Sequence, residues 1–436
     1  MNDKKAVVIG GGLAGVEAAK QLSKRGVKVT LYEMKPRKFS PAHKSEKLAE
    51  LVCSNSLKAE RVGSAAGLLK AEMSLFGSVC VDAAYKAKVP AGGALAVDRD
   101  VFSDEITKSI ENDENITLIR EEITEIPSDG IVIIAAGPLV SDSLAQKIGE
   151  LCGKDFLSFY DAAAPIVTAD SIDMENAFTQ SRYDRGGEDD YINCPLDKAQ
   201  YEEFYEALVN AESADLHSFD KRKDVYEGCM PIEVLASRGK DAMRYGPLKP
   251  VGLTNPKTGH RPWANLQLRK ENRDGTMYNL VGFQTNLKFP EQKRVFSMFP
   301  ALKNAEFVRY GVMHRNTFLN SPGLLSYDFS LKKDPRIYFA GQISGVEGYM
   351  ESASSGILAG YNAARRIFGE EPILLPKITM MGALSQYISD ETVKNFQPMG
   401  AAFGIINPLD ERIKDKKERY ETLAKRSLDY FKTIDL

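Results

Sequence analysis

The chain has 436 residues, more than one ordinary domain needs, so two domains are expected. Its net charge of −3, with 43% hydrophobic and 27% charged residues, is typical of a globular protein with well-packed cores. No apolar stretch reaches the length of about eighteen residues that a membrane span needs. The five cysteines show no CxxC spacing and the four histidines are scattered, so we expect no disulfide framework and no metal site. A reducing cytoplasm is the expected location.

The first 33 residues contain the most informative pattern in the chain. Residues 6–9 predict a buried strand, an amphipathic run to Ser23 predicts a helix, and residues 27–32 predict a second strand. A glycine-rich turn joins the first strand to the helix, and it consists of Gly10, Gly11, Gly12, Leu13, Ala14 and Gly15. In a GxGxxG turn the first glycine permits the tight turn, the second lets a pyrophosphate approach the backbone, and the third lets helix and strand pack closely.

An acidic residue, Glu33, closes the second strand. At this spacing a carboxylate can accept hydrogen bonds from both hydroxyls of a ribose, while the N–H groups at the start of the helix face the phosphates. The complete unit of strand, turn, helix, strand and acid predicts a dinucleotide site. A glycine turn that serves packing alone is the alternative.

Further elements follow this unit along the chain. A helix is expected over residues 98–110, and strands are expected over 116–120 and 130–136. A buried strand at 336–340 precedes Gly341, Gln342 and a small-residue helix over 348–368. In large flavin-binding proteins such a late strand returns to the first sheet and places a glycine beside the flavin, which favours FAD over NAD as the resident ligand. The helix start would then face the flavin, although ordinary helix–sheet packing explains its glycines equally well.

The cofactor domain is therefore expected to be discontinuous. We expect residues 1–140 plus 330–370 to bind FAD, residues 141–329 to form an inserted substrate and RNA domain, and residues 371–436 to form a C-terminal helical segment. Strands are expected within the insertion at 164–168, 277–284 and 306–309, and helices near the end at 384–388 and 411–431. The predicted fold class is α/β, with a Rossmann-like FAD-binding domain and a mixed α+β inserted domain, as in glutathione-reductase-like two-domain flavoproteins.

Two of the five cysteines have a sequence context that favours reactivity. Cys53 precedes polar residues typical of a helix start, where the dipole lowers a thiol pKa, and Cys229 lies in a turn between basic segments. Cys80 lies in an alternating pattern that predicts a buried strand, and Cys152 and Cys194 have no suggestive neighbours.

Positive charge is concentrated in one part of the chain. Between residues 238 and 273 the chain contains nine Lys or Arg and only two acidic residues, which gives a local charge of +7. The candidate RNA-binding residues from this stretch are Arg238, Arg244, Lys249, Arg261 and Trp263. Cations beside an exposed aromatic ring can hold single-stranded RNA, because phosphates contact the cations and a base stacks on the ring. Burial of Trp263 in a core beneath a solvated loop is the alternative.

Several longer motifs support a resemblance to a known family. They are LVCSNSL (51–57), YDAAAP (160–165), DYINCP (190–195), EGCMPIE (227–233), RYGPLKPVGL (244–253), VGFQT (281–285), YGVMHRNTF (310–318) and GQISGVEGY (341–349). Through these segments the sequence resembles the folate- and FAD-dependent tRNA (uracil-5-)-methyltransferases, the TrmFO family of the wider MnmG-like flavoprotein group. No motif of the family is recognised beyond residue 372.

The resemblance implies methylation of C5 of the T-loop uridine in tRNA, which forms ribothymidine. Methylenetetrahydrofolate would donate the carbon, FAD would act as reductant and methylene carrier, and NADPH or NADH would reduce the FAD. The family's two important thiols map onto Cys229, as the nucleophile at C6 of the uracil, and Cys53, as its protecting or deprotonating partner. His314, Trp263 or Tyr349 could stack on the folate or the flavin, and His314 is the candidate folate residue.

Four alternatives stay open at this point, of which a non-enzymatic RNA-binding flavoprotein fits least well, because its reactive cysteines would have no role. A related enzyme could methylate uridine in ribosomal RNA by the same chemistry, since the motifs concern chemistry rather than target recognition. An MnmG-type enzyme would share the cofactor fold but usually has a longer helical C-terminal region. An FAD oxidoreductase acting on a small metabolite would need neither the basic stretch nor two reactive thiols.

Overall fold

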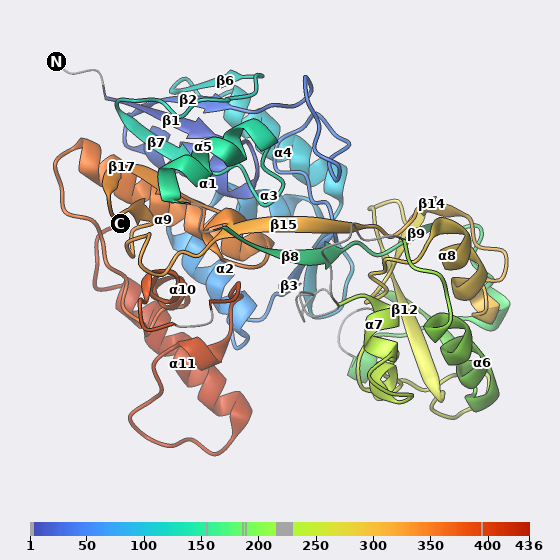
Figure 1. Ribbon diagram of the computed structural model, residues 1–436. Helices are drawn as coiled ribbons and strands as arrows, with labels where there is room; N and C mark the ends of the chain where they lie inside the picture. Colours follow the sequence, from blue (N-terminus) through green and yellow to red (C-terminus); the bar gives the residue numbers. More distant parts are fainter. Residues whose placement is uncertain (1–3, 154–155, 185–186, 188–189, 215–229, 394–395) are drawn as a thin grey trace.

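The computed structural model describes residues 4–153, 156–184, 187, 190–214, 230–393 and 396–436. The chain forms two lobes, of which the larger contains both terminal segments (Figure 1). Two antiparallel strands, β8 (Phe156–Ala162) and β15 (Met313–Leu319), run between the lobes (Figure 1). The chain thus crosses from the larger lobe to the smaller one and returns along the same two-stranded ribbon.

A six-stranded sheet forms the centre of the larger lobe, in the order β16-β17-β7-β1-β2-β6. Its strands are β1 (Lys5–Ile9), β2 (Lys28–Tyr32), β6 (Ile116–Ile119), β7 (Ile131–Ile134), β16 (Ser330–Leu331) and β17 (Asp334–Phe339). All neighbouring pairs are parallel except β16 with β17. The predicted return of the late strand to the first sheet is confirmed, because residues 337–339 pair with residues 132–134.

Helix α1 (Leu13–Lys24) follows the first strand and packs against α9 (Tyr349–Ile367). A Cβ atom added at Gly356 would lie 2.1 Å from the carbonyl oxygen of Ala14, and one added at Gly360 would lie 2.5 Å from that of Ala18. The small residues of α9 therefore bring two helices into close contact, whereas the sequence suggested a helix on a sheet. Two more helices of this lobe are α4 (Arg99–Glu111) and α5 (Asp142–Cys152).

A small antiparallel sheet stands beside this core in the order β3-β5-β4, with two helices. These elements are β3 (Ser56–Ala59), β4 (Lys88–Val89), β5 (Ala94–Val97), α2 (Ala65–Leu75) and α3 (Val79–Lys86). Two predictions are wrong here. Cys80 lies in α3 and not in a strand, because the Ser78 hydroxyl accepts from the Val81 N–H and caps a helix, although the thiol is fully buried as expected. Cys53 precedes strand β3 and not a helix.

The smaller lobe is built on an antiparallel six-stranded sheet in the order β10-β11-β12-β13-β9-β14. Its strands are β9 (Ile166–Thr168), β10 (Phe178–Thr179), β11 (Tyr191–Leu196), β12 (Ala264–Lys270), β13 (Met277–Leu280) and β14 (Phe307–Arg309). Its helices are α6 (Lys198–Val209), α7 (Ile232–Ala236) and α8 (Phe289–Phe296). Phe204, Phe283 and Phe299 are fully buried between sheet and helices, and the rings of Phe204 and Phe299 lie 4.9 Å apart.

The C-terminal segment packs on the larger lobe through α10 (Met380–Ser389) and α11 (Lys416–Phe431). The carboxylate of Glu72 in α2 accepts hydrogen bonds from the Met380 and Met381 N–H groups at 2.7 and 2.8 Å and from the Ser427 hydroxyl at 2.6 Å. Burial raises the pKa of Glu72 to about 7. One buried carboxylate thus joins α2, α10 and α11.

Short 3₁₀ helices occupy several of the connections. They are η1 (Met174–Asn176), η2 (Arg182–Asp184), η4 (Ala242–Tyr245), η5 (Pro300–Leu302), η6 (Gln342–Ser344) and η7 (Phe403–Ile405). Within the described part of the chain, no helix is both long enough and apolar enough to cross a membrane.

Candidate functional site

A cavity of about 430 Å³ opens at the carboxyl ends of the parallel strands. Its walls include the segments that directly follow β1, β2, β7 and β17, so four strands of one sheet point their ends at it. Open α/β sheets bind their ligands at this edge, because loops and helix starts converge there. The volume lies in the range of small-molecule sites, about 300–1,000 Å³.

The glycine-rich turn forms one end of the cavity. Gly10 has a φ of 105°, and a Cβ atom there would lie 2.4 Å from the carbonyl oxygen of Ala135. A Cβ atom at Gly15 would lie 1.8 Å from the carbonyl oxygen of Gly10, whereas one at Gly12 would meet no atom within 4 Å. Gly10 and Gly15 are therefore required by close backbone packing, while Gly12 borders open space at the start of α1.

Glu33 lies on the cavity wall with 7% of its surface exposed. One carboxylate oxygen accepts from the Gly11 N–H at 2.9 Å and the other accepts from the Lys35 N–H at 2.9 Å. These contacts fix the carboxylate beside the glycine-rich turn. Each carboxylate oxygen has two acceptor sites, so both can still accept from a ribose hydroxyl.

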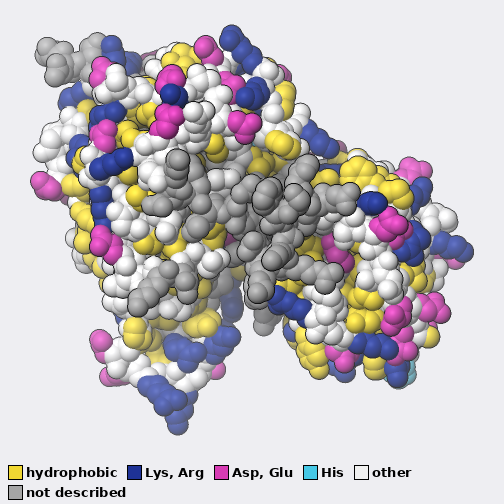
Figure 2. Space-filling model, viewed as in Figure 1, with side chains coloured by type: hydrophobic (Ala, Val, Ile, Leu, Met, Phe, Trp, Pro, Cys, Tyr) yellow, Lys and Arg dark blue, Asp and Glu magenta, His cyan; other side chains and the backbone are white. Residues whose placement is uncertain are grey.

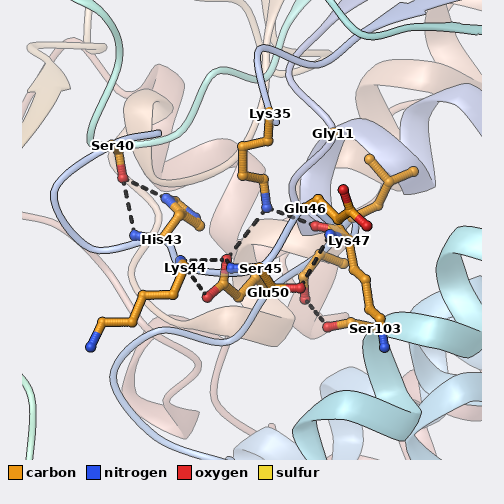
Figure 3. Close-up of polar contacts among 12 residues, drawn as sticks. Gly11, Lys35, Ser40, His43, Lys44, Ser45, Glu46, Lys47, Glu50 and Ser103 are labelled. Atoms are coloured by element: carbon orange, nitrogen blue, oxygen red, sulfur yellow. Dashed lines mark hydrogen bonds and ion pairs between the residues drawn. The ribbon is translucent and has the colours of Figure 1, made fainter. Parts of the chain in front are cut away.

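The loop after β2, residues 34–50, folds back over the glycine-rich turn (Figure 3). Glu50 accepts from the backbone N–H groups of Lys44 and Ser45 at 2.9 and 3.2 Å, and its carboxylate lies 3.4 Å from the Lys35 ammonium. The Ala49 N–H donates to the Gly11 carbonyl at 2.9 Å, which ties the end of the loop to the turn. No motif in the sequence indicated this anchoring.

The same loop places an imidazole on the cavity wall. His43 receives a 2.5 Å contact from the Ser40 hydroxyl through Nδ1, as Figure 3 shows. Burial and the nearby Lys35 ammonium lower the pKa of His43 below its ordinary value, so the ring is neutral at neutral pH.

The late segment closes the opposite side of the cavity. Gly341 and Gln342 follow β17, and the Gly341 N–H donates to the Ser355 hydroxyl at 2.7 Å. The Gln342 amide donates to the Glu347 carboxylate at 2.9 Å. Residues 348–352, which include the first turn of α9, also line the cavity. The positive end of this helix dipole is therefore available to an anionic ring system.

Cys53 lies in the wall of the same cavity as the dinucleotide elements. Its Sγ atom is 2.9 Å from the hydroxyl oxygen of Tyr349, the first residue of α9, and its backbone N–H donates to the same oxygen at 2.8 Å. Tyr349 is itself part of the wall. Burial raises the pKa of the Tyr349 hydroxyl well above its ordinary value, so it stays protonated at neutral pH.

Polar groups from both lobes meet behind Cys53. The Asn55 amide donates to the carbonyl oxygens of Val97 and Lys270 at 3.0 and 2.9 Å, and its oxygen accepts from Arg269 at 3.0 Å. The buried Glu271 carboxylate pairs with Arg99 at the start of α4. The loop that bears Cys53 is thus held by the smaller lobe as well as by its own lobe.

Arg309 of β14 completes this arrangement by donating to the Val52 carbonyl at 2.5 Å. Sequence reasoning missed Asn55, Arg99 and Arg309. The LVCSNSL motif contained the one available signal, because it placed Asn55 beside Cys53.

The two remaining candidate site residues are Cys229 and His314. Cys229 lies outside the described residues. His314 belongs to β15, where its backbone pairs with Asp161, and Asn316, two residues further along, is buried in the cavity wall.

The basic stretch between residues 238 and 273 borders a second cavity, of about 600 Å³, in the smaller lobe. Trp263 is 37% exposed there, so its alternative placement in a core is wrong. The Arg244 guanidinium lies 3.9 Å from the centre of the Trp263 ring, and the Lys198 ammonium lies 5.5 Å from it. Exposed Arg261 lines the same cavity, so three of the five candidate RNA residues meet at one place.

The remaining basic residues are dispersed. Arg238 is exposed after α7, and Lys249 is partly buried, with its carbonyl accepting from Arg182. Arg269 is 5% exposed and binds Asn55 across the lobes, so it contributes nothing to a surface. On the face seen in Figure 2, acidic and basic side chains are interspersed over the smaller lobe. Among the described residues, no group of three or more His, Cys, Asp or Glu could hold a metal ion.

Fold and site together define an α/β dinucleotide-binding protein with an inserted antiparallel domain, which confirms the predicted fold class. The model of the family "Glucose inhibited division protein A" (GIDA) matches residues 5–371. The chain belongs to this family, and within it to the TrmFO group.

Curated relatives match this chain over almost its whole length. The TrmFO methylenetetrahydrofolate–tRNA-(uracil-5-)-methyltransferase of Acetivibrio thermocellus is 58% identical and covers 98% of this chain and 97% of its own length. The enzyme of the same name from Desulforamulus reducens is 55% identical and covers 99% and 98%. The similarity therefore extends into the C-terminal segment, where the sequence offered no motif.

A solved structure of Aquifex aeolicus GidA has the same fold. It superposes with a TM-score of 0.71 at 17% identity, covering 99% of this chain and 73% of the GidA chain. At this identity the likeness concerns the fold alone.

Proposed function

We propose that this protein methylates C5 of the T-loop uridine in tRNA, with methylenetetrahydrofolate as carbon donor and FAD as bound cofactor. The observation that carries the proposal is the position of Cys53, which lies in the wall of the cavity formed by the glycine-rich turn, Glu33 and the start of α9. A flavin-dependent methyl transfer to a pyrimidine needs a thiol near the dinucleotide that can accept the C5 proton. Relatives with this activity in their names match almost the whole chain.

The residues around the cavity fit FAD. Gly12 and the start of α1 would receive the pyrophosphate, Glu33 would accept from the ribose, and Gly341, Gln342 and the start of α9 would border the isoalloxazine. When bound, FAD supplies the reducing equivalents that convert a carbon at the formaldehyde level into a methyl group. A nicotinamide nucleotide, NADPH or NADH, would recharge it.

Two thiols divide the work on the uracil ring in this proposal. C5 of uracil becomes nucleophilic once the Cys229 thiolate adds to C6 and generates an enolate. After carbon transfer, the C5–H bond breaks, the proton passes to Cys53, and the electron pair restores the C5–C6 double bond as the Cys229 sulfur leaves. The folate would lie between these groups, with His314 of β15 as the candidate contact.

Three parts of the chain have separate roles in this proposal. Residues 1–140 and 330–370 bind the flavin, residues 141–329 contact folate and RNA, and residues 371–436 brace the flavin domain. Arg238, Arg244, Lys249, Arg261 and Trp263 form the candidate RNA face, of which Arg244, Arg261 and Trp263 border one cavity. We place the protein in the cytoplasm, where tRNA and folate are found, and expect activity without an added metal ion.

The decisive experiment is a transfer assay with carbon-labelled methylenetetrahydrofolate and NADPH under nitrogen. Unmodified tRNA and ribosomal RNA are supplied side by side, and the labelled nucleoside is identified. Label in ribothymidine of tRNA supports the proposal. Label in ribosomal RNA alone would assign the chemistry to another target, and reduction of the flavin without label in any RNA would indicate an oxidoreductase of small metabolites.

A cysteine variant tests the proposed nucleophile. Cys229→Ala is expected to abolish transfer while flavin content, measured by absorbance, stays at the wild-type level. Cys194→Ala is a matched control, because that thiol is fully buried in the smaller lobe and burial raises its pKa. Loss of flavin in Cys229→Ala would make Cys229 a structural residue.

A further inference from the structure

The Tyr349 hydroxyl lies at the centre of a small hydrogen-bond cluster in the cavity wall. The N–H groups of Cys53 and Ser54 donate to its oxygen at 2.8 and 3.2 Å, and the Sγ atom of Cys53 lies 2.9 Å from it. These are its hydrogen-bond partners among the described residues. The first residue of α9 therefore holds the backbone and the sulfur of a loop almost 300 residues earlier in the chain, at a sequence separation of 296.

The number of donors and acceptors fixes the direction of the sulfur contact. A tyrosine hydroxyl has one proton to donate and two lone pairs that accept. The two backbone N–H groups can only donate, so they occupy both lone pairs. If the Cys53 S–H also donated, the oxygen would accept three bonds and its own proton would have no acceptor among the described residues. The hydroxyl proton must therefore point at the sulfur.

We propose that Tyr349 is a positioning residue whose hydroxyl donates to the Cys53 sulfur and thereby stabilises the thiolate form of Cys53. The inference deepens the proposed function and rests on it for its catalytic meaning, since only a thiolate can take a proton from the uracil adduct. A hydrogen bond to the charged form of an acid lowers the acid's pKa. Tyr349 is suited to this because burial keeps its own hydroxyl protonated.

Charged groups from every neighbouring element surround this pair, and most favour a negative sulfur. The guanidinium groups of Arg99 and Arg309 both interact electrostatically with the Cys53–Tyr349 pair. The charged neighbours on the packed elements are Arg99 (α4), Arg269 and Glu271 (β12 and after it), Arg309 (β14), Lys58 (β3), and Glu347 and Glu351 (at α9). Glu271 is paired with Arg99, and Glu351 with Lys58 at 2.6 Å, so these two carboxylates are offset by partners.

The test measures the rate at which iodoacetamide alkylates Cys53 in the flavin-loaded protein between pH 5 and 10. Peptide mass spectrometry reports Cys53 separately from the other cysteines. In Tyr349→Phe the midpoint of the Cys53 profile should rise by about one pH unit, so alkylation below the midpoint slows about tenfold and the rates converge at high pH. Equal midpoints, or a rate lowered by the same factor at every pH, would overturn the proposal.

Two further variants guard against a trivial outcome. Tyr361→Phe, in the same helix, removes a hydroxyl remote from the sulfur and should leave the Cys53 midpoint unchanged. Replacement of Tyr349 by 3-fluorotyrosine keeps the ring and makes the hydroxyl a stronger donor, so the midpoint should fall rather than rise. A rise, or no shift, in the fluorotyrosine protein would also overturn the proposal, even if Tyr349→Phe fails to fold.

The alkylation assay needs neither RNA nor folate, so its outcome is independent of methyl transfer. Shifted midpoints without RNA methylation would retain Tyr349 as the donor and reject the proposed function. RNA methylation with unshifted midpoints would support the proposed function and reject Tyr349 as the donor to the sulfur.

Discussion

Substitution of Gly12 by alanine is expected to weaken binding of the dinucleotide without lowering the stability of the fold. Gly12 precedes α1 with a φ of −75°, which any residue adopts, and a Cβ atom there would meet nothing within 4 Å. The protein without ligand therefore accommodates the methyl group. A glycine-to-alanine change at a permitted conformation stabilises a protein by about 0.4–1 kcal/mol, because the unfolded chain has fewer conformations to lose.

The same methyl group would occupy the space that a pyrophosphate needs. Displacing the phosphates from the start of α1 weakens hydrogen bonds to a charged group, each worth about 1.5–3 kcal/mol. Loss of one such bond raises the Kd for FAD about 10- to 100-fold. Gly12→Ala is therefore expected to bind FAD poorly while its flavin-free form melts at or slightly above the wild-type temperature.

Gly15→Ala is the matched comparison within the same turn. A Cβ atom there would lie 1.8 Å from the Gly10 carbonyl oxygen, so helix and strand must separate. Overpacking of this kind costs about 1–3 kcal/mol, which should lower the melting temperature of the flavin-free protein. FAD titration followed by quenching of flavin fluorescence, with thermal melts of the flavin-free forms, measures both effects. Wild-type FAD affinity in Gly12→Ala would refute the placement of the pyrophosphate at this turn.

Three more predictions concern the loop, the C-terminal segment and the basic cavity. Glu50→Gln should raise the Kd for FAD about tenfold, because loss of one charge-assisted bond loosens the loop over the glycine-rich turn, and an unchanged Kd would contradict this. The pKa of Glu72 is raised from 4.5 to about 7 in the fold, so the folded state holds the proton more tightly and stability falls as pH rises between these values. Urea unfolding should show this loss, about 3 kcal/mol, in wild type and not in Glu72→Gln. Replacing Arg244 and Arg261 by alanine should make the slope of log K for tRNA against log salt less negative by about 1.5, and an unchanged slope would remove this cavity from the RNA interface.

The elements predicted well from the sequence are those whose cause is local. In the turn between β1 and α1, Gly10 has a φ of 105° and Gly15 faces the carbonyl oxygen of Gly10 in the same turn, so its composition reveals it. The helix at 98–110 was also found, and Asp98 does cap α4 by accepting from the N–H groups of residues 100 and 101. Residue spacing carries such information because the interacting groups are close in sequence.

Strand β12 was missed, and its buried polar side chains are held by a strand far away in sequence. Every residue of β12 from 264 to 269 is buried, yet the strand contains Asn265, Gln267 and Arg269. Asn265 and Gln267 bind the side-chain oxygen of Asn193 in β11, more than 70 residues away. Ala264, Leu266 and Leu268 alternate with these polar residues, which is the period-two pattern of a strand, so β12 could have been predicted from the sequence. The pattern does not reveal that the polar face is buried as well, because its partner lies in a distant part of the chain.

The surroundings of Cys53 illustrate the same limit for the site. Cys53 was singled out because a helix start, with its dipole, was expected after it, but strand β3 follows. The sulfur contacts Tyr349 and interacts electrostatically with Arg309, while Arg99 interacts with Tyr349. None of them lies within 40 residues of Cys53. The reactivity of Cys53 stays a prediction, and the fold replaces the helix dipole on which it was based with contacts to residues far away in sequence.

The basic stretch shows why a count of charges in the sequence overestimates the positive charge on the protein surface. Arg269 contributes to the local charge of +7 in the sequence, yet its guanidinium is buried and binds Asn55 and Ser54 in the opposite lobe. Burial lowers the pKa of Arg269 from its ordinary value, although at a group so basic the charge persists at neutral pH. Its effect is therefore to fix the Cys53 loop to the smaller lobe, which leaves the group around Trp263 as the part of the stretch that can meet RNA. Neutralising Arg269 should therefore change the pH dependence of Cys53 alkylation and leave the salt dependence of RNA binding unchanged.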